Sequence, residues 1–331
     1  MHPRFEPWLV SLVFALALFS SAVSSESAGA AAAAESSPFE GLFTRAACDG
    51  PAGPFSTEII SLADGTCRFV QIRGDDRSEI LVSGGRVHQT TDTSARLAAA
   101  PAFLERFVRG HEVHRLLCDA PESTERGEPL ELSLHEDLGG GTVRIEFSDW
   151  RPVHGIDLPF QVDFIHGQQH FTHRFTAILP FRIAPGSSLP PDPIARFDRL
   201  GDLAEIAALH QRVLDAHLEG DVQGILGDES AMGTTSGRGR LETKSRDALA
   251  QRLGAYLETT HFERYEDTVI PIIAVSADGS LGWLGCEIEA AGSQQDASGA
   301  VSPLAYGFSW VELVAREDGQ WKRIGNASSA R

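Results

Sequence analysis

The chain has 331 residues, of which 42% are hydrophobic and 22% are charged, and its formal net charge is -18 at pH 7. This composition is that of a globular protein and excludes a disordered or fibrous chain. The negative charge disfavours nucleic acid and anionic membrane surfaces as partners, because both are polyanions.

The first 37 residues are typical of an export signal followed by a flexible leader. An apolar run of twelve residues spans 8–19 and is followed by Ser20-Ser21-Ala22. Twelve residues are too few to cross a bilayer as a helix, which needs about 20, but they suit the core of a signal peptide. We therefore expect a signal peptide over 1–22, a leader over 23–37, and a periplasmic or extracellular protein that is soluble after cleavage, without stable membrane insertion.

Residues 38–183 predict an antiparallel β domain with one inserted helix. Runs of apolar and β-branched residues predict strands over 55–61, 66–73, 78–83, 86–90, 130–135, 142–148, 160–165 and 170–178. Apolar residues at helical spacing predict a helix from Pro101 to Leu117.

The last two of these strands predict a hairpin with an apolar face. A four-residue loop from His166 to Gln169 places Phe164 opposite Phe171 and keeps the apolar side chains together. The residues of this face, which we expect to bind an apolar ligand, are Phe160, Val162, Phe164, Phe171, His173 and Phe175. One helix cannot cover so many strands, so part of the face should stay open as a cavity.

The stretch FSDWRPVHGIDLPF, from Phe147 to Phe160, precedes this hairpin. Together they resemble the closing strands of the lipoprotein-carrier-like family of exported bacterial proteins, over residues 55–180. The resemblance implies an open β-barrel with a helix as its lid. It also implies an apolar or lipid-like small molecule as the partner of this domain.

Three histidines, His166, His170 and His173, lie close together in the sequence. His170 and His173 point to opposite faces of the predicted hairpin, and no Cys or carboxylate is spaced to complete a site. We therefore expect no metal and no cofactor.

The chain has four cysteines, which can pair in an oxidising compartment. Cys48 and Cys67 lie 19 residues apart in the first domain and are predicted to form a disulfide. Cys118 could compete for either of them. Cys286 is expected to be a buried free thiol in a strand of the second domain.

A Pro-rich linker over 184–196 separates the first domain from a second one over 197–331. Two helices are predicted, one capped by Asp202 and ending at Leu218, the other from Ser245 to Leu257. Strands are predicted over 269–275, 281–289, 306–316 and 320–325, and the last two meet in an Asp318-Gly319 hairpin. This order predicts an α+β fold in which helices pack on a curved antiparallel sheet.

The second domain resembles the nuclear-transport-factor-2-like superfamily, in its SnoaL-like and ketosteroid-isomerase-like branches. The resemblance rests on Leu218-Glu219-Gly220-Asp221, on Tyr265-Glu266-Asp267 and on the ending from Trp310 to Asn326. It implies a cone-shaped domain with a small-molecule pocket between sheet and helices, and a homodimer through the sheet.

Members of that superfamily that move protons carry a carboxylate on the strand after the first helices. Residues 230–235 contain no Asp or Glu, and the preceding Asp228 and Glu229 look like turn residues. A general base must reach its proton, so this departure counts against isomerase chemistry.

Residues expected to line the second pocket are His210, Leu214, His217, Tyr256, Trp310 and Asn326. His210 and His217 share the apolar face of the first helix, but they lie about 10.5 Å apart along its axis, too far to hold one metal together. His217, His210 and Tyr256 are the candidates for acid or base catalysis. Three functions stay open: a ligand-binding protein without catalysis, an isomerase, cyclase or dehydratase, and a dimerisation or interaction module.

Overall fold

The computed structural model describes residues 39–51, 53–63, 66–83, 86–90, 98–99, 129–133, 142–185, 187, 189–237 and 239–330. The predicted signal peptide, the leader, the helix over 101–117 and Cys118 lie outside these residues. The chain divides into two compact units, Met1–Pro180 with Pro191–Leu200, and Phe181–Pro190 with Gly201–Arg331.

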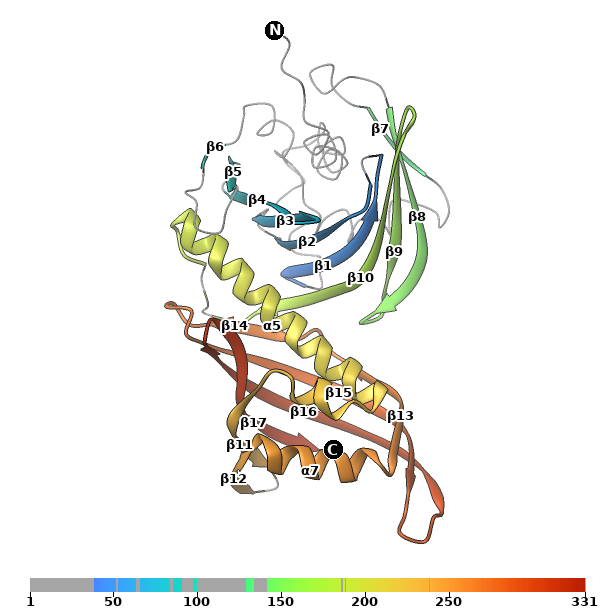
Figure 1. The fold of residues 1–331 in the computed structure, drawn as a ribbon, viewed down its shortest axis with the longest axis vertical. Coiled ribbons are helices and arrows are strands. Elements are labelled where there is room, and N and C mark those ends of the chain that lie inside the picture. Colours follow the sequence, from blue (N-terminus) through green and yellow to red (C-terminus); the bar gives the residue numbers. More distant parts are fainter. Residues whose placement is uncertain are drawn as a thin grey trace. The chain divides into compact units, whose positions relative to one another are not determined.

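Most of the described residues of the first unit lie in strands (Figure 1). They are β1 Gly41–Asp49, β2 Phe55–Leu62, β3 Cys67–Arg73, β4 Asp76–Ser83, β5 Arg86–Thr90, β6 Ala98–Ala99, β7 Leu130–Ser133, β8 Thr142–Val153, β9 Ile156–His166 and β10 Gln169–Ile183. Strands β1 to β6 pair in succession and antiparallel, as do β7 to β10. Their core includes the fully buried side chains of Phe39, Leu42, Phe69, Ile80 and Leu81.

The β9–β10 hairpin has the predicted register, with Phe164 opposite Phe171. The predicted four-residue loop is wrong, because the ladder continues to the pair His166 and Gln169. Gly167 adopts a φ of 58°, a left-handed conformation that glycine reaches without strain. The chain can therefore turn within two residues and extend both strands.

Three helices are present among the described residues: α5 Pro193–Glu219, α6 Val222–Leu226 and α7 Arg246–Leu257. Helix α7 is the one predicted from Ser245, whose hydroxyl accepts a hydrogen bond from the Ala248 amide. Helix α5 begins nine residues before the predicted cap, because Pro193 suits a first turn and the Asp192 carboxylate accepts from the Ala195 amide at 2.9 Å.

Asp202 is therefore not a helix cap. It is buried inside α5, where it accepts a hydrogen bond from the indole Nε1 of Trp321 at 3.2 Å and forms an ion pair with Arg316. Both partners lie at the end of the chain, so they tie the helix to the last hairpin.

The remaining strands belong to the second unit (Figure 1). They are β11 Glu229–Gly237, β12 Arg240–Ser245, β13 Thr260–Asp267, β14 Ile272–Val275, β15 Leu281–Gln295, β16 Val301–Glu317 and β17 Gln320–Ala330. Strand β15 pairs antiparallel with β13, β14 and β16, and β16 pairs with β17. Strand β17 pairs in parallel with β11, and β11 pairs antiparallel with β12.

The hairpin between β16 and β17 is confirmed. Glu317 pairs with Gln320, and the two turn residues Asp318 and Gly319 have φ values of 50° and 79°. Positive φ at both positions is the geometry that favours Asp-Gly in two-residue turns.

The predicted α+β class is wrong. In the described part of the chain, the strands account for far more residues than the three helices, and the strands of the second unit form a mixed sheet. The sheet is not purely antiparallel either, because β10 pairs in parallel with β14 and β11 with β17. The expectation of an open barrel followed by a helix-covered antiparallel cone is replaced by a mostly β chain.

The predicted disulfide is also absent, since Cys48 and Cys67 are both free and buried. On β1, Cys48 pairs with Phe55 of β2, whereas Cys67 of β3 pairs with Ser61 of β2. Six residues of extended strand between those partners correspond to about 20 Å. A disulfide requires its two Cα atoms within about 7 Å.

In the described ranges, no helix has the length and apolar character needed to cross a membrane.

Candidate small-molecule site

The inner face of the second unit is built by side-chain alternation along β15 and β16. Cys286, Ile288 and Ala290 are buried on β15, with intermediate or exposed residues between them. Cys286 lies opposite Trp310 of β16, and Glu312 follows two residues later on the same face. This pattern carries polar side chains into the interior.

His210 of α5 and Asp267 of β13 form a buried pair there. His210 Nε2 lies 3.0 Å from Asp267 Oδ1 and 2.9 Å from Oδ2, and the ring lies 5.6 Å from the Trp310 ring. Burial lowers the pKa of His210, but the charge and hydrogen bond of Asp267 outweigh it, and the pKa is raised overall. Among the described residues, Nδ1 of His210 has no hydrogen-bond partner.

A second buried network surrounds Arg323 of β17. Its guanidinium lies 3.1 Å from a Glu229 oxygen and 3.5 Å from a Glu312 oxygen, and it donates to the Ile225 carbonyl. Burial raises the pKa of Glu229, although Arg323 opposes this. Glu229 is the first residue of β11 and faces this network, so its assignment as a turn residue is wrong.

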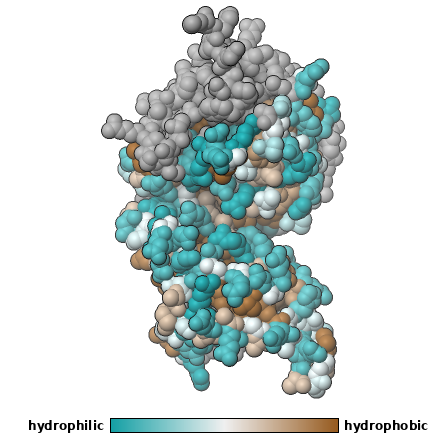
Figure 2. All heavy atoms as spheres, viewed as in Figure 1, coloured by the Kyte–Doolittle hydropathy of each residue, from teal (hydrophilic) through white to brown (hydrophobic). Residues whose placement is uncertain are grey.

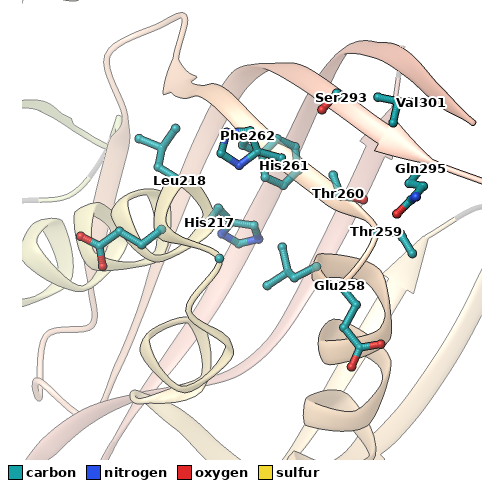
Figure 3. Close-up of a pocket in the computed structure, with 13 residues that line it drawn as sticks. His217, Leu218, Glu258, Thr259, Thr260, His261, Phe262, Ser293, Gln295 and Val301 are labelled. Atoms are coloured by element: carbon teal, nitrogen blue, oxygen red, sulfur yellow. The ribbon is translucent and has the colours of Figure 1, made fainter. Parts of the chain in front are cut away.

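A cavity of about 480 Å³ opens beside the end of α5 (Figure 3). Its lining comes from α5, from the end of α7, from β13, and from β15 and β16. The lining residues are His217, Leu218, Glu219, Gly220, Leu257, Glu258, Thr259, Thr260, His261, Phe262, Ser293, Gln295 and Val301. Figure 3 shows His217 and Leu218 on one side of it, and Thr259, Thr260 and Gln295 on the other.

His217 is fixed by two contacts. Its Nδ1 lies 2.7 Å from the Val213 carbonyl oxygen, and its ring stacks on Tyr265 with centroids 4.2 Å apart and planes 4° apart. Burial lowers the pKa of His217 to about 4, so the ring is neutral near pH 7. A carbonyl can only accept, so Nδ1 carries the proton and Nε2 is left as a hydrogen-bond acceptor.

The other residues expected at this pocket are scattered over the second unit. Tyr256 lies with its hydroxyl 3.3 Å from that of Tyr306, and it does not line the cavity. Leu214 is buried on α5, and Asn326 pairs with Glu312 between β16 and β17. Of the six expected residues, His217 is thus the one that lines the cavity of Figure 3.

Part of the apolar set expected to bind a ligand in the first unit packs around His173, which pairs with Val162 and has its ring 5.0 Å from that of Phe164. Val162, Phe164, Phe171 and His173 are all less than 5% exposed, while Phe160 and Phe175 are half-buried. Burial lowers the pKa of His173 to about 4. Val162, Phe164, Phe171 and His173 are packed as a core. Ligand binding by this set stays a prediction.

His170 and His173 of that hairpin have different partners. The exposed His170 bonds to Asp163 at 3.0 Å, whereas the buried His173 lies with Nδ1 3.3 Å from Cys48 Sγ. Opposite faces for these two rings follow from the strand period, as the sequence predicts.

No protein-family model and no curated protein matches the chain. Similar solved structures include a ketosteroid isomerase-like protein from Erwinia carotovora atroseptica, 23% identical, with a TM-score of 0.31, covering 39% of this chain and 95% of that one. An NTF2-like protein from Cytophaga hutchinsonii is 16% identical, with a TM-score of 0.32, over 38% of this chain and 95% of that one. An NTF2-like protein of unknown function in nutrient uptake from Rhodospirillum rubrum is also 16% identical, with a TM-score of 0.32, over 38% and 98%.

These solved neighbours are NTF2-like or ketosteroid isomerase-like proteins, and each covers about two fifths of the chain. Because the TM-scores are near 0.3, the likeness carries no argument about function.

Proposed function

We propose that the second unit binds a small molecule in the cavity beside His217, without catalysis. The observation that carries this proposal is the neutral His217 ring, held by Val213 and Tyr265 at the wall of the cavity with Nε2 left as an acceptor. A volume of about 480 Å³ is in the range of pockets that hold small ligands.

The lining indicates the ligand's charge. It contains the carboxylates Glu219 and Glu258 and no Lys or Arg, and the whole chain carries a net charge of -18. A negatively charged ligand would meet no compensating cation there, because His217 is neutral. The site therefore suits an uncharged or cationic molecule.

The lining also indicates the ligand's shape and polarity. Leu218, Leu257, Phe262 and Val301 provide apolar surface, and His217 provides an acceptor. A largely apolar or aromatic body with one N–H or O–H donor would match both features. Pockets of this kind commonly combine apolar walls with a few polar groups that fix orientation.

Binding is favoured over proton transfer by the protonation states of the residues. A base whose pKa is about 4 accepts a proton poorly at neutral pH, where a general base works best with a pKa near the working pH. The pKa of Tyr306 is raised by burial and by Tyr256, so that hydroxyl is a poor acid. His210 has a raised pKa but does not line the cavity.

A ligand-observed NMR screen tests this proposal. Indole and N-methylindole form a matched pair of probes, with and without the donor. We expect the donor-bearing probe to bind wild-type protein more tightly, by up to about tenfold, since one hydrogen bond contributes about 0.5–1.5 kcal/mol. His217→Phe keeps a ring beside Tyr265 but removes the acceptor, and should abolish the preference.

Asp215→Asn is the matched control, because Asp215 is an exposed residue of the same helix that does not line the cavity. It should keep the preference of the wild type. Equal binding of both probes to wild type, or a preference that survives in His217→Phe, would contradict the proposed role of His217.

A further inference from the structure

Three metal-ligating side chains of different chemistry meet on the inner face of the second unit, apart from the cavity. They are the imidazole of His210, the carboxylate of Asp267 and the thiol of Cys286, from α5, β13 and β15. One ligand atom from each lies within 4.8 Å of the others. The side chains of His210 and Asp267 are 4% and 6% exposed, and Cys286 is 7% exposed.

Strand register explains why the two sheet residues meet. Asp267 pairs with Ile288, and Cys286 lies two residues before Ile288 on the same face of β15. Such diagonal neighbours lie within reach of each other's side chains. Cys286 in turn pairs with Trp310, whose ring packs against His210 and holds the helix residue over the pair.

We propose that His210, Asp267 and Cys286 form a binding site for a divalent zinc-class metal ion, with a fourth position left for water or a small ligand. Sulfur, nitrogen and oxygen ligands together suit Zn²⁺ and Co²⁺, whereas Mg²⁺ and Ca²⁺ prefer oxygen alone. Three protein ligands with one open position is the arrangement of zinc sites that take an exchangeable ligand.

The local charge supports a cation at this point. Asp267, Glu312 and Glu229 bring three carboxylates into the interior, and Arg323 bonds to two of them. With His210 bound as the neutral ring, three carboxylates would face one guanidinium, and a divalent ion would offset that difference.

Binding would exchange protons for the metal. The ion would take the place of the proton between His210 Nε2 and Asp267. The His210 ring would then be neutral with its one proton on Nδ1, and the Cys286 thiol would release its proton to solvent. The site is independent of the cavity beside His217, and neither proposal needs the other.

Titration of the reduced full chain with Co²⁺ alone tests the proposal. We expect one ion per chain and a thiolate-to-cobalt charge-transfer band in the near ultraviolet, both displaced by stoichiometric Zn²⁺. Wild-type protein that binds no Co²⁺, or binds it without that band, would overturn the assignment whatever the variants do.

Cys286→Ser should lose the band and bind Co²⁺ at least about tenfold more weakly. Cys48→Ser is the matched control, because Cys48 is also a buried free thiol beside a histidine, but in the first unit. It should keep the band at full intensity. A band that persists in Cys286→Ser or disappears in Cys48→Ser would assign the thiolate elsewhere and overturn the site. Circular dichroism of each variant shows whether it is folded, and if Cys286→Ser is not, Asp267→Asn takes its place with the same expected loss of affinity.

Discussion

His217 is held neutral by its surroundings, and this makes the stability of the protein depend on pH. Its pKa is lowered by burial from an ordinary 6.5 to about 4, as is that of His173 in the first unit. Between these values the unfolded chain binds a proton that the folded chain does not. The free energy of unfolding is therefore highest above pH 6.5, where both histidines are neutral in both states, and it decreases as the pH falls towards 4.

We expect His217→Phe to reduce this acid sensitivity. Each group lowers the free energy of unfolding by up to about 1.4 kcal/mol per pH unit in that window, or roughly 3 kcal/mol in all. The variant should lose less stability than wild type between pH 7 and pH 4.5, measured by urea unfolding at several pH values. An unchanged pH dependence would mean that His217 is solvated in the folded protein.

Cys48 and His173 resemble a nucleophile with its base but are expected to be inert. Burial raises the pKa of Cys48 to about 12, and burial lowers that of His173 to about 4, so no thiolate–imidazolium pair forms. Alkylation of native Cys48 by iodoacetamide at pH 7.5 should be at least about a hundredfold slower than that of an exposed thiol. Peptide mass spectrometry that finds it modified as fast in native as in urea-unfolded protein would refute this.

At the scale of elements, the cavity depends on a close approach of β13 and β15. These strands change register between Phe262 and Arg264, and a Cβ on Gly292 would overlap the carbonyl oxygen of His261. His261 and Ser293 line the cavity on either side of this contact. Gly292 therefore allows the two strands to meet at the cavity wall.

Gly292→Ala should destabilise the second unit by about 1–3 kcal/mol, because backbone atoms must shift to make room. Gly254→Ala is the control, since a Cβ there meets no atom within 4 Å. Gly254 lies inside α7, so alanine should stabilise the helix by about 0.5–1 kcal/mol. Thermal unfolding of both variants checks the pair, and equal stability of the two would contradict the close approach.

Elements marked by local signals could be predicted from the sequence. The Asp318-Gly319 turn and the Ser245 cap are specified by the residues that form them, and the register of the β9–β10 hairpin follows from one apolar face. Strand β11 carries no such signal, because its sequence is small and polar and its parallel partner β17 lies about ninety residues away in the chain.

The candidate sites depend on such long-range contacts. Glu229 looked like a turn residue because only the pairing of β11 with β17 brings it to Arg323. Strand β13 was not predicted, because the register shift after Phe262 breaks the alternation of buried and exposed residues before Asp267. No local sequence pattern links Asp267 and Cys286 to His210. The three side chains meet only when α5 packs on β13 and β15 in the folded structure.

For the whole molecule, the net charge of -18 attracts cationic ligands to the protein and repels anionic ones. Among the coloured residues in Figure 2, hydrophilic ones predominate, with hydrophobic patches between them. Val311 and Leu313 of β16 are 42% and 47% exposed, and the homodimer expected through the second domain, which would cover such residues, stays a prediction.

The charge makes a prediction about ligands. A cationic aromatic probe such as tryptamine should bind more weakly as ionic strength rises from 0.05 to 0.5 M, because salt shortens the range of the attraction. Indole, which is uncharged, should bind equally in both. Calorimetry at the two salt concentrations compares them, and tighter binding of the anionic indole-3-acetate would show that the lining is not what selects the ligand.

The most direct test concerns the ring nitrogens of His217 themselves. In protein labelled with ¹⁵N-histidine, two-bond correlation spectra report which nitrogen carries the proton. We expect Nδ1 to be protonated and Nε2 bare from pH 8 down to pH 5, and the Nε2 resonance to move upfield when a donor-bearing fragment is added. A proton on Nε2 in the free protein, or an Nε2 resonance that stays unchanged while a fragment binds, would contradict a small-molecule site built on His217.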